Sequence, residues 1–276
     1  MNEILRTFII AEAGINHDGD VCKAKELATA AHMAGASAVK FQTFIADTLA
    51  LDEEQFKTLS RYQLGFPEFR ELKAHCDRIG IEFISTPFCP QTAQFLNAIG
   101  VRRFKISSGN ATNMALIKLI ASFRKEVILS LGMTTLEEKQ AAVATLLGYG
   151  MKPKDVVLMY CRSQYPATEE NVHLGNLRHL LKHRMRVGFS DHTKSTNVPV
   201  LAVAMGAEVI EKHFTLWPAA PGADHAMSVG PEQFEQMVEG IRRAEGVMSY
   251  GPQITQDEKL LRDVWIKRVE KQNGRK

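Results

Sequence analysis

The sequence predicts an α/β protein built as a (β/α)8 barrel, the TIM-barrel fold. Eight short apolar runs recur along the chain, and segments with helical periodicity separate them. Strict alternation of strands and helices is typical of a parallel sheet. Eight such units within about 250 residues are what this barrel contains. The sequence carries no GxGxxG fingerprint, which would favour a doubly wound dinucleotide-binding fold.

The strands are predicted where β-branched and aromatic residues precede a polar residue or a turn. Their expected ranges are residues 8–14, 38–44, 82–88, 103–109, 127–133, 156–162, 186–192 and 208–214. Between them lie segments such as AKELATAAHMAG and FRELKAHCDRIG, whose apolar residues recur every three or four positions and whose final glycine ends the helix.

We expect residues 1–251 to form the barrel and residues 252–276 to form a basic, amphipathic helical tail. In the tail, Leu261, Val264, Trp265 and Arg268 fall on one helical stripe. This stripe favours docking on the barrel; docking on another subunit and a membrane-surface role are the alternatives.

The composition excludes several classes of protein. The 276 residues are 45% hydrophobic and 24% charged, which is ordinary for a globular domain. The net charge of +3 equals the excess of seven Lys or Arg over four Asp or Glu in residues 257–276, so the rest of the chain is balanced and no nucleic-acid-binding face is expected. Four scattered cysteines without a CxxC pair, no cationic leader and no apolar run of about 20 residues predict a cytoplasmic protein without a membrane span.

Polar residues gather in the C-terminal halves of the predicted strands, which form the catalytic face of such a barrel. They are Glu12, Lys40, Thr86, Lys105, Ser130, Arg162, Ser190, His192, Glu211 and His213. Because side chains alternate along a strand, Ser190 and His192 share one face, and so do Glu211 and His213. Their neighbours Asp191 and Lys212 point the other way. The last two strands are adjacent in a barrel, so His192 and His213 are expected to approach each other at its mouth.

Seven strand motifs and one loop motif follow one another in the order AEAGINHDG, AVKFQTF, ISTPF, FKISSGN, VILSLGM, GFSDHT, EVIEKHFTL and PGADH. In this order, from about Phe8 to Gly251, the chain resembles the sialic acid synthase family. The resemblance implies an enzyme that condenses phosphoenolpyruvate with an N-acylated sugar aldehyde. Such an enzyme forms a nonulosonic acid, releases phosphate, and uses a divalent metal, usually Mn2+.

The resemblance implies that His192 and His213 are catalytic residues that hold the metal. Imidazole suits a borderline divalent ion, and two protein ligands leave positions open for water and substrate. The alternative is a pair of hydrogen-bonded core histidines. Glu12 is expected to be catalytic or to orient the sugar, with a structural ion pair to Lys40 or Lys105 as its alternative.

The remaining predicted residues bind substrate. Lys40 and Lys105 would supply positive charge to phosphoenolpyruvate, because a lysine at the end of an apolar strand is seldom buried without an anion. Hydroxyls are expected from Thr86, Ser108, Ser130 and Ser190, each of which has a local capping bond as its alternative. The sugar is expected to contact Tyr165, Glu211 and Asp224.

Two features depart from the family. Asn110, which is expected to contact substrate, stands where relatives usually carry Glu or Asp, and an amide cannot act as a general base. The chain also ends where relatives continue into a small antifreeze-like domain, so the sugar pocket is predicted to be completed by a separate lid protein or to accept a different sugar. A homo-oligomer is also expected. Arg162 hints at a more acidic acceptor. The alternative function is a non-catalytic relative that binds a sugar or a phosphorylated metabolite as a regulator or subunit.

Overall fold

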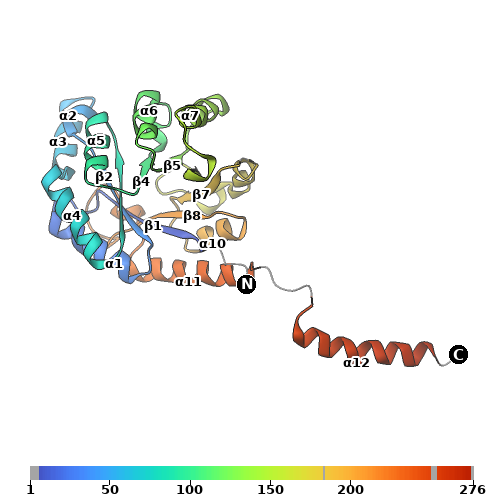
Figure 1. Ribbon diagram of the computed structural model, residues 1–276. Coiled ribbons are helices and arrows are strands. Elements are labelled where there is room, and N and C mark those ends of the chain that lie inside the picture. The colour runs from blue at the N-terminus through green and yellow to red at the C-terminus, as the bar shows by residue number, and fades with distance from the viewer. Residues whose placement is uncertain (1–5, 183, 250–253, 275–276) are drawn as a thin grey trace.

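The computed structural model describes residues 6–182, 184–249 and 254–274. Eight parallel strands form one sheet that curves into a nearly closed barrel with helices around it (Figure 1). The strands are β1 (Phe8–Gly14), β2 (Ala38–Thr43), β3 (Glu82–Pro87), β4 (Arg103–Ile106), β5 (Glu126–Ser130), β6 (Val156–Cys161), β7 (Arg186–Asp191) and β8 (Val209–His213). Their hydrogen-bonded order is β3-β2-β1-β8-β7-β6-β5-β4. The predicted (β/α)8 fold is confirmed.

The helices follow the strands in chain order, and several begin at side-chain caps. Asp20 caps α1, while Thr135 and Glu138 form a capping box at α7. The α-helices are α1 (Val21–Met33), α2 (Ala46–Leu49), α3 (Glu53–Tyr62), α4 (Phe66–Ile79), α5 (Pro90–Ala98), α6 (Met114–Ser122), α7 (Leu136–Gly148), α8 (Glu169–Val172), α9 (Leu177–Leu180), α10 (Asn197–Ala204), α11 (Pro231–Val247) and α12 (Gln256–Asn273). Short 3-10 turns are η1 (Ser108–Asn110), η2 (Pro153–Asp155), η3 (Leu174–Asn176) and η4 (His225–Met227).

Each strand lies where the sequence predicts it, with small shifts at the ends. β1 has the predicted bounds, and most of the others end one to three residues earlier. β4 and β5 each end three residues earlier than predicted, and β4 stops at Ile106 because Ser108–Asn110 turns into η1. The main core lies outside the barrel wall, where residues such as Leu27, Phe69 and Phe214 pack between strands and helices.

The interior of the barrel is filled in layers. At the amino ends of the strands, Arg103 bonds Glu82 at 2.7 Å and Glu126 at 2.5 Å, and Arg186 bonds Glu126 at 3.3 Å and Glu208 at 2.9 Å. The bond between Arg103 and Glu82 ties β4 to β3, the two ends of the strand order. Above these ion pairs lies an inner apolar layer made of Ile10, Ala38, Ile84, Ile128, Val157, Met159 and Val209.

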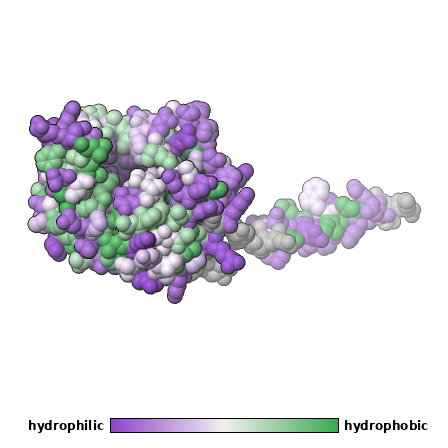
Figure 2. Space-filling view, turned by 90° about the horizontal axis from the view of Figure 1, so that it is seen from above, coloured by the Kyte–Doolittle hydropathy of each residue, from purple (hydrophilic) through white to green (hydrophobic). Residues whose placement is uncertain are grey.

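Helix α12 stands clear of the barrel (Figures 1 and 2), and every residue of it is exposed. The predicted docking of the tail on the barrel is therefore wrong for this structure. Ile266 points away from the predicted stripe, so the apolar residues of the helix are not all gathered on one side. The predicted boundary at residues 251 and 252 lies outside the described residues. Among the described helices, none has the length and hydropathy of a membrane-spanning segment.

Deleting residues 254–276 is expected to leave the stability of the barrel unchanged. Because α12 buries no residue, its removal exposes no core surface, and the free energy of unfolding should change by less than about 0.5 kcal/mol. Thermal unfolding of the shortened chain followed by circular dichroism checks this. A clearly lower melting temperature would show that the tail packs on the body or on another copy in solution.

Candidate active site

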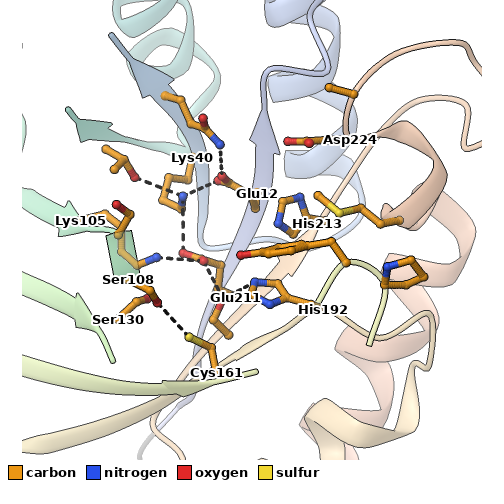
Figure 3. A pocket seen from close by; sticks show the side chains of 18 of the residues that line it. Glu12, Lys40, Lys105, Ser108, Ser130, Cys161, His192, Glu211, His213 and Asp224 are labelled. Carbon is orange, nitrogen blue, oxygen red and sulfur yellow. Dashed lines mark hydrogen bonds and ion pairs between the residues drawn. The ribbon is translucent and has the colours of Figure 1, made fainter. Parts of the chain in front are cut away.

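A cavity of about 440 Å³ opens at the carboxyl ends of the strands, directly above the inner apolar layer. Its size suits a small-molecule site. Figure 3 shows side chains from β1, β2, β4, β5, β6 and β8, and His192 directly after β7, around it. Twelve predicted residues line it: Glu12, Lys40, Thr86, Lys105, Ser108, Ser130, Tyr165, Ser190, His192, Glu211, His213 and Asp224.

The floor of the cavity is a network of two lysines and two glutamates. Lys40 Nζ lies 2.6 Å from Glu12 Oε2 and 3.7 Å from Glu211 Oε2. Lys105 Nζ donates to Glu211 Oε1 at 3.0 Å, and Ser190 Oγ donates to the same oxygen at 2.8 Å. All four charged side chains are at most 4% exposed. Strand register explains part of the network, because Glu12 pairs with Lys40 across β1 and β2.

The two glutamates differ in their protonation. Burial raises the pKa of Glu12 to about 7, although Lys40 opposes this shift. Burial acts in the same direction on Glu211, but Lys105 and Lys40 outweigh it and hold the pKa of that carboxyl well below its usual range. Glu211 is therefore the ionised partner of both lysines. Of the two glutamates, Glu12 is the one whose pKa lies near neutral pH.

Hydroxyls surround the lysines. Thr86 Oγ1 lies 3.3 Å from Lys40 Nζ, and Ser108 Oγ accepts a hydrogen bond from Gly132 N at 3.0 Å. The Ser130 hydroxyl is buried without a hydrogen-bond partner within the described residues. A buried hydroxyl without a partner is uncommon, so Ser130 is free to donate to a ligand in the cavity.

His192 and His213 lie side by side at the rim, with ring centroids 5.5 Å apart. Burial lowers the pKa of His192 and lowers that of His213 well below its usual range, so both rings are neutral near pH 7. His192 Nδ1 lies 2.6 Å from the Arg162 carbonyl oxygen and must donate to it, so Nε2 carries the lone pair. Ser190 Oγ lies 3.4 Å from Nε2 but donates its hydrogen to Glu211. His213 Nδ1 is buried without a partner within the described residues. The Tyr165 ring lies against His192 with centroids 4.2 Å apart and is tilted by 37°.

Asp224 reaches the cavity from the loop after β8 and is held there by the turn after β1. Asn16 Nδ2 donates to the Phe214 carbonyl and to Ser228 Oγ, each at 2.9 Å, and Ser228 Oγ donates to the Asp224 carbonyl at 2.6 Å. Burial raises the pKa of Asp224. Asn16 thus supports the loop that carries Asp224.

Two residues from the sequence analysis lie outside the cavity. Asn110 is not among the residues that line it, because η1 turns its side chain toward Ser107, where Nδ2 lies 3.4 Å from Oγ. A substrate contact from Asn110 stays a prediction. The Arg162 side chain is exposed and does not line the cavity either, and its described contact is the carbonyl bond to His192.

Sequence reasoning missed other lining residues. Gln42 Nε2 donates to Glu12 Oε1 at 3.3 Å, and strand alternation could have found it, since it lies two residues after Lys40 on the same face of β2. Cys161 Sγ lies 3.2 Å from Ser108 Oγ at the end of β6. Phe88 and Met227 add apolar wall and carry no sequence signal for a site.

The chain is similar to known sugar acid synthases over most of its length. N,N'-diacetyllegionaminic acid synthase from Legionella pneumophila is 42% identical over 271 residues, which cover 92% of this chain and 76% of that protein. Pseudaminic acid synthase from Campylobacter jejuni is 33% identical, covering 94% and 79%. The crystal structure of an N-acetylneuraminic acid (sialic acid) synthetase from Leptospira borgpetersenii superimposes with a TM-score of 0.87 at 32% identity, covering 98% and 93%.

The sequence pattern of the NeuB family matches residues 27–253. This range includes most of the cavity residues, from Lys40 on β2 to Asp224 after β8. The chain belongs to the NeuB family.

Proposed function

We propose that this chain is an enzyme that condenses phosphoenolpyruvate with the aldehyde form of an N-acylated sugar, giving a sialic-acid-like nonulosonic acid and phosphate. The observation that carries the proposal is the division of one cavity into two ends. Two lysines and free hydroxyls lie at one end, and two neutral histidines with Asp224 lie at the other.

The lysine end suits phosphoenolpyruvate, which carries a carboxylate and a phosphate. Anions of this kind are held by charge-assisted hydrogen bonds from cations and hydroxyls. Lys40, Lys105, Thr86, Ser108 and Ser130 offer such donors within one wall of the cavity. When Glu12 is protonated, the network consists of two positively charged lysines and one negatively charged glutamate, Glu211. Its net charge is then +1, which attracts an anion.

The histidine end fits a divalent metal such as Mn2+. Both rings are neutral, and His213 keeps a buried nitrogen without a partner, so each can offer a lone pair to an ion. Within the described residues no group of three or more His, Cys, Asp or Glu side chains is arranged for a metal, so His192 and His213 would share it with substrate and water. A bound divalent ion would polarise the aldehyde oxygen as a Lewis acid.

The chain's own residues position the reactants and move the proton. Lys40 and Lys105 hold the anion so that C3 of phosphoenolpyruvate faces the aldehyde carbon, and the new carbon-carbon bond forms between these atoms. Water then adds to C2, loses a proton, and phosphate leaves, while the former aldehyde oxygen gains a proton. Glu12, with its pKa of about 7, is suited to exchange that proton near neutral pH.

The direct test is incubation with Mn2+, phosphoenolpyruvate and a panel of N-acylated hexosamines. We expect phosphate release that depends on the sugar, together with a new nine-carbon acid detected by mass spectrometry. Asn110, which cannot act as a base, favours one alternative, a relative that binds without catalysis. Binding of phosphoenolpyruvate without phosphate release from any sugar would support that alternative.

The acceptor is expected to carry no phosphate. The lining cations within the described residues are Lys40 and Lys105, which are paired with glutamates, and the loop side of the cavity holds Asp224 with Ala223 and Met227. A phosphorylated sugar would meet a carboxylate there, contrary to the acidic acceptor that Arg162 suggested. Comparing kcat/KM for an N-acylated hexosamine and its 6-phosphate checks this; faster turnover of the phosphorylated sugar would contradict it.

Gly14→Ala is expected to weaken sugar binding. Gly14 has a φ of +54°, and an added Cβ would lie 3.1 Å from Asp224 Oδ2 and 3.4 Å from Glu12 Oε1. Backbone strain should cost about 1–2 kcal/mol of stability, and the contact with Asp224 should raise KM for the sugar. The matched control is Gly80→Ala, which has a φ of +84° and no atom within 4 Å of the added Cβ. It should lose stability without a change in KM, and equal KM values for the two variants would contradict the prediction.

A further inference from the structure

Lys212 is a buried cation that does not face the cavity. Its side chain is 0% exposed, and Nζ lies 2.6 Å from Asp191 Oδ2. It also donates to the carbonyl oxygens of Thr193 at 2.5 Å and Ser195 at 2.7 Å. All three hydrogens of the ammonium group are thus used, and the lysine is held on the outer side of the barrel wall.

Asp191 is bonded as fully as Lys212. Its Oδ1 accepts from Thr193 N at 3.0 Å, and its Oδ2 accepts from Thr193 Oγ1 at 3.0 Å. The Thr193 hydroxyl in turn accepts from Ser195 N at 3.1 Å. Lys212, Asp191 and Thr193 therefore form one closed network, here called the outer lock, that joins β8 to the loop after β7.

The outer lock lies directly behind the two histidines. Asp191 and Lys212 are register partners across β7 and β8, as are Ser190 and Glu211. Because successive side chains point to opposite faces, fixing Asp191 and Lys212 outside fixes Ser190, His192, Glu211 and His213 inside. A slip of β8 by one residue against β7 would turn Glu211 and His213 away from the cavity.

The lock also holds the backbone that follows His192. Thr193 and Ser195 belong to this loop, and Lys212 binds both of their carbonyl groups from the strand that carries His213. On its other side, His192 is held through Nδ1 by the Arg162 carbonyl. A buried ion pair adds little stability over an apolar pair of similar size, so stability alone does not account for charges at this position.

We propose that Lys212, Asp191 and Thr193 are positioning residues that set the spacing of His192 and His213 for metal binding. This inference rests on the proposed metal site. It predicts that the outer lock affects the affinity for the metal. The ion pairs of Arg103 and Arg186 at the amino ends of the strands should affect only the stability of the fold.

The test measures the Kd for Mn2+ without substrates, by electron paramagnetic resonance, together with the melting temperature. The double variant Asp191→Asn/Lys212→Met removes both charges, so no buried charge is left unpaired. We expect it to bind Mn2+ about 10- to 100-fold more weakly, the range for groups that orient metal ligands. Thr193→Val is a milder change and should weaken Mn2+ binding to a smaller extent. It replaces the double variant in the test if the double variant does not fold.

Two reference variants separate the possible failures. Arg186→Met breaks ion pairs at the other end of β7 and should lower the melting temperature without changing the Kd. His213→Ala should lose Mn2+ binding. If His213→Ala binds Mn2+ as wild type does, the proposed metal site is wrong and the positioning role falls with it. If His213→Ala loses Mn2+ while Asp191→Asn/Lys212→Met and Thr193→Val stay within about twofold of wild type, the lock alone is wrong.

Discussion

Lys105→Met should reduce kcat/KM for phosphoenolpyruvate by about 10²- to 10³-fold, the equivalent of about 3–4 kcal/mol of lost interaction with a buried charge. Lys105 is 3% exposed and its bonded partner is Glu211. Without the lysine, a bound anion would face Glu211 with only Lys40 to offset it. The ligand would therefore lose an attraction and gain a repulsion at once. Isothermal titration with phosphoenolpyruvate and steady-state kinetics both measure the loss.

The matched control for this variant lies on the same strand. Arg103 is two residues before Lys105 on β4, so its side chain shares the inner face but lies at the amino end, where it bonds Glu82 and Glu126. Arg103→Met should lower the melting temperature and leave the affinity for phosphoenolpyruvate unchanged. If both variants lose affinity to the same extent, general loosening of the barrel explains the effect and Lys105 does not bind the anion.

Phosphoenolpyruvate should bind together with a proton, and Glu12 is the group that takes it up. The pKa of Glu12 is about 7 in the free protein, so the carboxyl is half protonated at neutral pH. A ligand whose phosphate alone carries a charge of about −1.5 to −2 raises that pKa further, because negative charge nearby favours the neutral carboxyl. The complex then holds more protons than the free protein, and affinity must rise as the pH falls from about 8 toward 7.

Glu12→Gln tests this coupling between protonation and binding, because it should strengthen the binding of phosphoenolpyruvate and slow its turnover. At pH 8 the variant lacks the negative charge that Glu12 carries in wild type, so it should bind phosphoenolpyruvate more tightly. It should also lose about 10²- to 10⁴-fold in kcat, because Gln cannot exchange a proton. Titration calorimetry in buffers of different ionisation enthalpy would show proton uptake in wild type and a smaller uptake in the variant. Weaker binding at pH 8 would contradict the proposed role.

The fold followed from the sequence because each of its signals is local. Apolar runs and glycine stops marked the eight strands, and alternation placed His192 and His213 on the inner face and Asp191 and Lys212 on the outer. Cavity residues on the strands, such as Lys40 and Glu211, could likewise be chosen by their position at strand ends, whereas Ser108, Tyr165 and Asp224 were expected from the family resemblance. Predictions of this kind need only the two-residue period of a strand and the shared edge of parallel strands.

Other features depend on distant partners and could not be predicted. Nothing in the segment FKISSGN shows that Lys105 meets Glu211, 106 residues away, or that η1 turns Asn110 aside. The different protonation of Glu12 and Glu211 arises because one faces a single close lysine and the other faces two. The predicted docking of the tail on the barrel was wrong for another reason. A stripe of apolar residues indicates that a helix face can be covered, but it does not identify the surface that covers it.

The inner apolar layer closes the cavity at the end that lies inside the barrel. Ile84 and Ile128, which belong to that layer, are the register partners of Lys40 and Lys105, so the lysines sit at the bottom, whereas Tyr165 and Asp224 come from loops beyond the strand ends. Within the described residues every member of this layer is fully buried, so the opening at the strand ends is the route for small molecules. If the lysines hold the anion and the loop side holds the sugar, as proposed, the anion should be loaded first and the sugar should block its exit.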